Sequence, residues 1–102
     1  MKLSVGQSLG SSVDATTVIV VRAPGDDVVV TCGGVEMYDA KKGTAVEAAA
    51  DPAQMNGTQL GKRYVDDNAT IELLATKGGD ASLALAGSAL SIKTAKPLPS
   101  SD

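Results

Sequence analysis

The chain has 102 residues, a net charge of −3 and a pI near 4.7, and it contains no His, Trp or Phe. Without histidine, no His-based catalytic triad or acid–base pair is available, and a single cysteine, Cys32, cannot complete a His/Cys zinc site. The acidic charge differs from the basic stripe of nucleic-acid-binding proteins, so we expect no nucleic-acid partner. The length predicts one domain over residues 1–95, followed by an extended Pro-containing tail at 96–102.

Strand-forming residues dominate the first forty positions. Residues 2–5 predict a short strand that leads into a Gly/Ser-rich stretch. Residues 16–23 are rich in β-branched side chains and almost continuously apolar, which predicts a strand buried on both faces. A Pro-Gly-Asp-Asp turn follows, so we expect residues 28–32 to return as the second strand of a hairpin, and residues 35–38 to add a third.

The middle of the chain is a long connection over residues 41–63. Thr44-Ala45-Val46-Glu47 has the form of a capping box and precedes three alanines, which predicts one short helix near 44–50, stopped at Asp51-Pro52. A connection of this length is either a lid over a site or a plain insertion. A longer packed helix over residues 44–55 would make the fold α+β instead.

Strand patterns return after the connection. Residues 70–75, 82–85 and 89–92 alternate or continue apolar side chains and are separated by Gly-containing turns, which predicts a meander. The whole chain therefore predicts a mainly β domain. We expect an antiparallel meander or small barrel-like sandwich of short strands, with the one helix near 44–50.

The two halves of the chain show a weak repeat. Residues 18–37 align with residues 71–90 without a gap, and the alignment matches Gly-Asp turns and the pair Gly34 and Gly87. An internal duplication would explain the match. Chance agreement between Val-, Leu- and Gly-rich segments would explain it as well.

One segment carries a resemblance to a known family. Residues 28–37 read Val-Val-Val-Thr-Cys-Gly-Gly-Val-Glu-Met, a predicted strand that ends in cysteine and then Gly-x-x-Met. This is similar to the closing half of the desulforedoxin-type iron domain, which also begins desulfoferrodoxins. The resemblance places the four iron-ligand positions on Ser11, Asp14, Cys32 and Gly33. Only Cys32 is a thiol, so the resemblance implies a similar β-knuckle without an Fe(Cys)₄ site.

Cys32 has two interpretations. It is a vestigial ligand or redox-active thiol, or it is a small buried hydrophobic residue in a valine-rich strand. A reactive thiol requires a nearby cation or helix N-terminus, and the local sequence has neither, which favours the packing role. We predict no catalytic residue, no metal ligand and no cofactor.

Three functions remain open at this level. The first is a non-catalytic accessory or interaction domain, which the missing catalytic groups favour. The second is a degenerate metal-binding or electron-transfer domain of desulforedoxin type. The third is an enzyme that acts on a small molecule with carboxylates, for which the chain offers Asp14, Asp66, Asp67 and Glu72.

Partners and location follow from composition. A core without large aromatic side chains, together with strands that need cover on both faces, predicts a homodimer or a protein partner. The longest apolar run, residues 18–21, is far shorter than a membrane span, and the start lacks a signal-peptide pattern. With a single cysteine that cannot form an internal disulfide, these features predict a soluble cytoplasmic protein without membrane contact.

Overall fold

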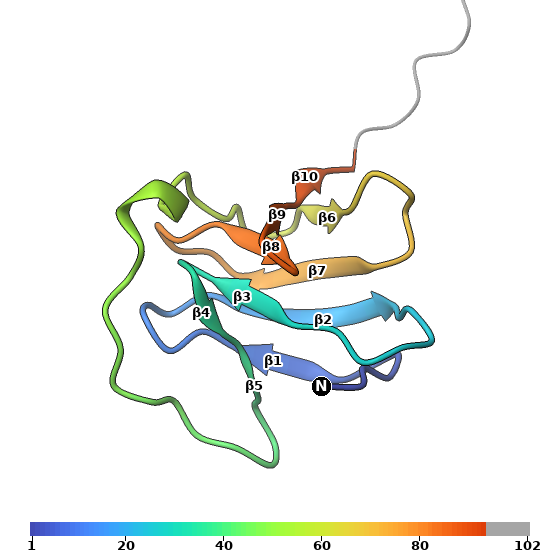
Figure 1. Cartoon of the computed structure of the whole chain (residues 1–102), viewed down its shortest axis with the longest axis horizontal. Helices are drawn as coiled ribbons and strands as arrows, with labels where there is room; N and C mark the ends of the chain where they lie inside the picture. Colours follow the sequence, from blue (N-terminus) through green and yellow to red (C-terminus); the bar gives the residue numbers. More distant parts are fainter. Residues whose placement is uncertain (94–102) are drawn as a thin grey trace, which may run out of the picture.

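The computed structural model describes residues 1–93, and its strands form two antiparallel sheets that pack into a sandwich (Figure 1). The six-stranded sheet has the order β10-β6-β7-β2-β1-β5, and the four-stranded sheet has the order β4-β3-β8-β9. The strands are β1 Ser8–Gly10, β2 Thr17–Arg22, β3 Val30–Cys32, β4 Val35–Glu36, β5 Tyr38–Asp39, β6 Arg63–Val65, β7 Glu72–Lys77, β8 Leu83–Leu85, β9 Ser88–Ala89 and β10 Ser91–Ile92. The mainly β sandwich predicted from the sequence is confirmed. The predicted tail, residues 96–102, lies outside the described residues.

The predicted helix near 44–50 is wrong in position. Residues 44–50 have no regular secondary structure, and the one helical segment in the described part of the chain is the 3-10 turn η1, Pro52–Gln54. Asp51 caps this turn by accepting a hydrogen bond from the Ala53 amide at 2.9 Å. Proline is favoured at the first helical position, so Pro52 begins the turn instead of ending a helix. No helix within residues 1–93 has the length and hydrophobicity to cross a membrane.

The predicted hairpin between residues 16–23 and 28–32 is also wrong. β2 belongs to the six-stranded sheet, whereas β3 belongs to the four-stranded sheet. The turn between them therefore crosses from one layer to the other, and the same is true of the turn between β7 and β8. Apolar, β-branched composition identified these strands but carried no information about which strands pair.

The burial of β2 also differs from the prediction. Val18 and Val20 are fully buried, whereas Thr17, Ile19 and Val21 are only half-buried. The inner face of the strand therefore points into the sandwich, and the outer face is partly covered. The apolar run reflects a central strand of the larger sheet, with β1 and β7 on its two sides.

Two strands occupy segments that the sequence patterns did not mark. β1 lies in the Gly/Ser-rich stretch after residues 2–5, which themselves form only an isolated bridge from Lys2 to Asp27. β6 lies at the end of the long connection, so this connection spans residues 40–62 and is called the connector below. Leu9 and Tyr64, on these two strands, both point into the core.

The core lies between the sheets and draws on both halves of the chain. Its fully buried side chains of largest volume are aliphatic or sulfur-containing, apart from one threonine. They are Leu9, Met37, Ile71, Leu73, Leu83, Val18, Val20, Thr16 and Cys32.

The strand order has an internal two-fold relation. Each strand of β1–β5 has a counterpart five numbers later, in β6–β10. When every strand is replaced by its counterpart, each sheet has the same strand order, written in the opposite direction. The halves meet where β2 pairs with β7 in one sheet and β3 pairs with β8 in the other. In the central pair, Ile19 lies opposite Leu74, its own counterpart in the other half.

Backbone hydrogen bonds repeat along with the strands. The Gly6 amide donates to the Val20 carbonyl at 2.7 Å, and the corresponding Gly61 amide donates to the Ala75 carbonyl at 2.8 Å. Both glycines have positive φ, +90° and +81°. The correspondence therefore extends beyond strand order to local geometry. A common origin of the halves by duplication stays a prediction.

The register of this correspondence changes once. β1 and β2 begin at Ser8 and Thr17, each 55 residues before its counterpart, whereas β3, β4 and β5 each begin 53 residues before theirs. The two-residue difference lies in the β2–β3 turn, which is longer than the β7–β8 turn. A gapless alignment of residues 18–37 with residues 71–90 is therefore in register after this turn and shifted by two residues before it.

Candidate functional site

The structure brings together three of the four positions to which the desulforedoxin resemblance assigned ligands. Cys32 lies at the end of β3 with no exposed surface, and the hydroxyls of Ser11 and Thr16 lie beside its thiol. Asp14 is close enough to act on the thiol electrostatically, and Gly33 follows it in the chain. Burial raises the pKa of the Cys32 thiol, with the negative charge of Asp14 adding to the effect. A buried thiol that stays protonated is a poor nucleophile and a poor metal ligand.

Asp14 has a structural role in this cluster. Its carboxylate accepts hydrogen bonds from the Ala81 amide at 2.9 Å and from the Thr16 amide at 3.0 Å. Burial alone would raise the pKa of Asp14, but these backbone hydrogen bonds hold it below its usual value. Asp14 thus ties the β1–β2 turn to the segment before β8, and its negative charge is stabilised by hydrogen-bond donors of the protein. Within residues 1–93 no three His, Cys, Asp or Glu side chains converge as metal ligands.

Glu72 is the most buried carboxylate of the four considered as catalytic groups, with 4% of the residue exposed. Arg63 from β6 contacts one of its oxygens at 3.2 Å, and Lys93 contacts the other at 3.0 Å. The hydrogen bond from Lys93 is the main cause that lowers the pKa of Glu72. A buried carboxylate held ionised by two cations is a structural ion-pair group and a weak base.

Asp66 and Asp67 lie elsewhere, at the mouth of a pocket of about 220 Å³. The pocket lies between the β6–β7 turn and the β8–β9 hairpin, and we call it the open groove. Its lining residues are Asp66, Asp67, Asn68, Leu85, Ala86, Ser88 and Ala89. Apart from Asp66 and Leu85, which are half-buried, these residues are exposed. β9 is the outermost strand of its sheet, and both of its residues, Ser88 and Ala89, line the groove.

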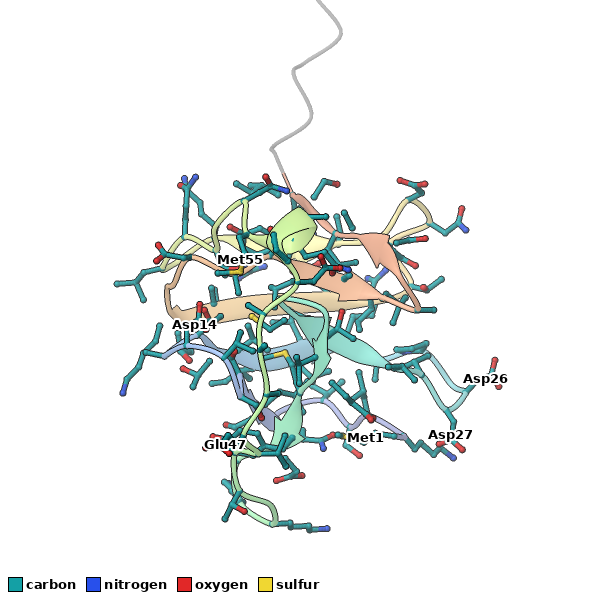
Figure 2. The ribbon with its side chains drawn as sticks, turned by 60° about the vertical axis from the view of Figure 1, so that its left-hand side comes forward. Met1, Asp14, Asp26, Asp27, Glu47 and Met55 are labelled. Carbon is teal, nitrogen blue, oxygen red and sulfur yellow. The ribbon has the colours of Figure 1, made fainter. Side chains whose placement is uncertain are left out.

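The corresponding region of the first half is covered by the chain itself. Ser12 and Gly33 there correspond to Asp67 and Ala86 of the open groove. The Val46 amide of the connector donates to the Ser12 hydroxyl at 3.0 Å, and the Asp51 amide donates to the Gly33 carbonyl at 2.7 Å. Figure 1 shows the connector running along the outside of the sandwich, and Figure 2, where Glu47 is labelled on it, shows it from the front.

Exposure of the two regions differs accordingly. Gly33 is buried and Val35 is half-buried, whereas their counterparts Ala86 and Ser88 are exposed. The difference arises from the connector, which has no described counterpart over the second half. Within residues 1–93, one of two matching surfaces is therefore covered and the other is open.

The electrostatics of the two regions also differ. Asp66 accepts hydrogen bonds from the hydroxyl of Thr70 and from its amide, the latter at 2.7 Å, and these bonds lower its pKa although partial burial alone would raise it. Asp66 is therefore ionised at neutral pH and acts within its own turn. Asp67 is exposed next to it. Two serines, Ser11 and Ser12, hold the corresponding positions of the first half, so these two positions carry negative charge only in the open groove.

Comparison with known proteins gives no match: no family model, no curated protein and no solved structure is similar to this chain. The resemblance to the desulforedoxin-type domain accordingly remains a prediction.

Sequence reasoning identified Asp66 and Asp67 only as carboxylates and missed the other groove residues. Leu85, Ala86, Ser88 and Ala89 belong to a hairpin about twenty residues later in the chain. The sequence repeat did not reveal them, because its gapless alignment begins at residue 18 and its spacing of 53 residues differs by two from the spacing that places residues 66–68 at the positions of residues 11–13. Residues 11–13 are covered by the connector in the first half, and no sequence pattern showed that cover.

Proposed function

We propose that this chain is a non-catalytic interaction domain that binds a partner protein through the open groove. The observation that carries the proposal is the difference between the two halves. Both present a turn and a hairpin in the same arrangement, yet only the first is covered by the chain's own connector. The second leaves a pocket with apolar and polar lining beside a free strand edge, and such edges favour strand or peptide addition.

The carboxylates support binding over catalysis. A general base at neutral pH requires a pKa near the working pH. Asp14, Asp66 and Glu72 instead have lowered pKa values, and each is hydrogen bonded to protein groups. Asp67 is exposed at the groove and free to contribute charge to a partner.

Site-directed photocrosslinking in the producing cells tests this function. A benzophenone side chain at Ser88, in the open groove, should crosslink to one defined protein. The same group at Asp26, on the exposed β2–β3 turn, is the control. Ala89→Tyr fills the groove from an exposed strand position and should abolish the Ser88 product. Identical products from Ser88 and Asp26, or products unaffected by Ala89→Tyr, would contradict the proposal.

Homodimerisation is a second proposal about partners. It is supported by Ile19, Val21 and Leu74, which are half-buried on the outer face of the six-stranded sheet where the halves pair. Light scattering across micromolar concentrations should give twice the 10.2 kDa chain mass. The mass of a single chain at all concentrations would overturn it.

Location in a reducing compartment is also a proposal. It is supported by Cys32, the only cysteine in the chain, which is buried and free. A fold that needs no disulfide is stable in the cytoplasm. Fractionation that recovers the protein outside the cytoplasm would contradict it.

A further inference from the structure

We propose that the partner occupies the open groove as an extended peptide segment with small side chains and one lysine or arginine. The segment would lie on the second half as residues 46–51 lie on the first. This inference rests on the proposed function and adds to it the conformation and chemistry of the ligand.

The connector, as it lies on the first half, is the example from which we infer this binding mode. Over the first half the connector has no regular secondary structure, and two of its amides, those of Val46 and Asp51, donate to the Ser12 hydroxyl and the Gly33 carbonyl. Five residues of extended chain span roughly 17 Å, so the two hydrogen bonds anchor a segment, not a single side chain. The open groove offers the Asp67 carboxylate and the Ala86 carbonyl at the corresponding positions.

The contact over the first half favours small side chains. There the small side chain of Ala50 packs on Gly33, and a Cβ on this glycine would be in ordinary van der Waals contact with the Ala50 Cβ, at 3.5 Å. The open groove has Ala86 in place of that glycine, and Ser88 and Ala89 border it. Small floor residues allow the backbone of a ligand to approach, but the alanine methyl occupies room that the first half leaves free. We therefore expect Gly, Ala or Ser opposite Ala86.

The negative charge of the open groove determines which side chain we expect at the ligand position that corresponds to Glu47. The connector has Glu47 immediately after Val46, the residue whose amide donates to the uncharged Ser12. A glutamate in the same place over the open groove would follow directly on the residue opposite Asp67, with the ionised Asp66 beside it. Opposite charges attract and like charges repel. The open groove should therefore select a cation where the connector carries an anion.

A synthetic peptide with the sequence of the connector can be used to probe binding to the open groove. We would titrate the full-length ¹⁵N-labelled protein with a synthetic peptide of residues 44–53 that carries Glu47→Lys, and follow amide chemical shifts. We expect shift changes confined to residues 66–68 and 85–89, because the first-half surface is already occupied. The unmodified peptide should bind about fivefold more weakly at low salt, as a reversed exposed charge pair would cause.

Two protein variants complete the test. Asp67→Asn should remove most of the preference for the lysine peptide, whereas Asp26→Asn, an equal charge change on the exposed β2–β3 turn, should leave it intact. No localised shifts at millimolar peptide, shifts on another surface, or equal affinity for both peptides would overturn the inference. If the Ser88 crosslink forms while both peptides fail, the partner binds through a folded surface and only this inference falls. If the crosslink fails as well, the proposed function falls with it.

Discussion

Cys32 lies at the end of β3 among the side chains of Ser11, Thr16 and the apolar core, with no exposed surface. We expect Cys32→Ala to fold normally and to lose about 1 kcal/mol in the free energy of unfolding, since the substitution removes one buried atom. Urea unfolding followed by circular dichroism measures this loss. We also expect the native protein to be colourless and its unfolding midpoint to be unchanged by a chelator. A red, chelator-sensitive protein would instead support the desulforedoxin-type alternative.

Glu72 gives the fold a specific pH dependence. Its pKa is lowered in the folded protein by Lys93 and Arg63, so folding favours the ionised form. The resulting stabilisation is fully present above the usual glutamate pKa of about 4.3 and is lost as pH falls through the lower folded-state value.

We expect Glu72→Gln to lower the free energy of unfolding by about 1 to 2 kcal/mol at pH 7, because two charge-assisted hydrogen bonds to a buried group are weakened. The difference from the wild type should shrink below pH 4. Denaturant unfolding at pH 7, 5 and 3 measures it. A difference that stays constant over this range would show that the ion pairs contribute nothing.

At the scale of elements, the β3–β4 and β8–β9 hairpins form a matched pair. Gly34 and Gly87 occupy corresponding turn positions with φ of +82° and +86°. A Cβ on Gly87 would meet nothing within 4 Å, whereas a Cβ on Gly34 would be 2.7 Å from the Cβ of Asp51 on the connector. The two glycines thus share a backbone conformation that would be strained for other residues, but they differ in what covers them.

We expect Gly87→Ala to cost about 1 kcal/mol through backbone strain alone. Gly34→Ala should cost more and should release the connector, seen as faster hydrogen exchange at the Asp51 amide. Gly87→Ala, as the control, should leave that amide protected. Equal costs with a protected Asp51 amide in both variants would show that the connector does not pack on this turn.

The elements also show what a sequence can reveal. β2, β3, β7 and β8 were identified by their apolar and β-branched side chains, which mark strands that contribute to a core. β1 and β6 are three residues long and each has one buried large apolar side chain, so their pairing with β2 and β7 is set by tertiary contacts. The open groove depends on that pairing and on the path of the connector, neither of which periodicity encodes.

At the scale of the whole molecule, each sheet is completed at the contact between the halves. β2 pairs with β7 and β3 with β8, so separating the halves would expose the centre of both sheets. We expect the fragments 1–47 and 48–102, cut within the exposed part of the connector, to be unfolded or self-associated when alone. Mixing them should restore strand circular dichroism and a heterodimer by light scattering. A fragment that is both folded and monomeric would contradict this expectation.

The pairing of β2 with β7 also has a kinetic consequence. The central strand pair of the larger sheet joins Ile19 to Leu74. More than fifty residues of chain must therefore be closed into a loop before β2 and β7 can pair. Chains whose contacts are this distant in sequence fold in milliseconds to seconds, far more slowly than helical domains of equal size. Loop-closure entropy grows only with the logarithm of length. Shortening the connector would therefore change this rate little, and the slow step lies in the search for register between two similar strands.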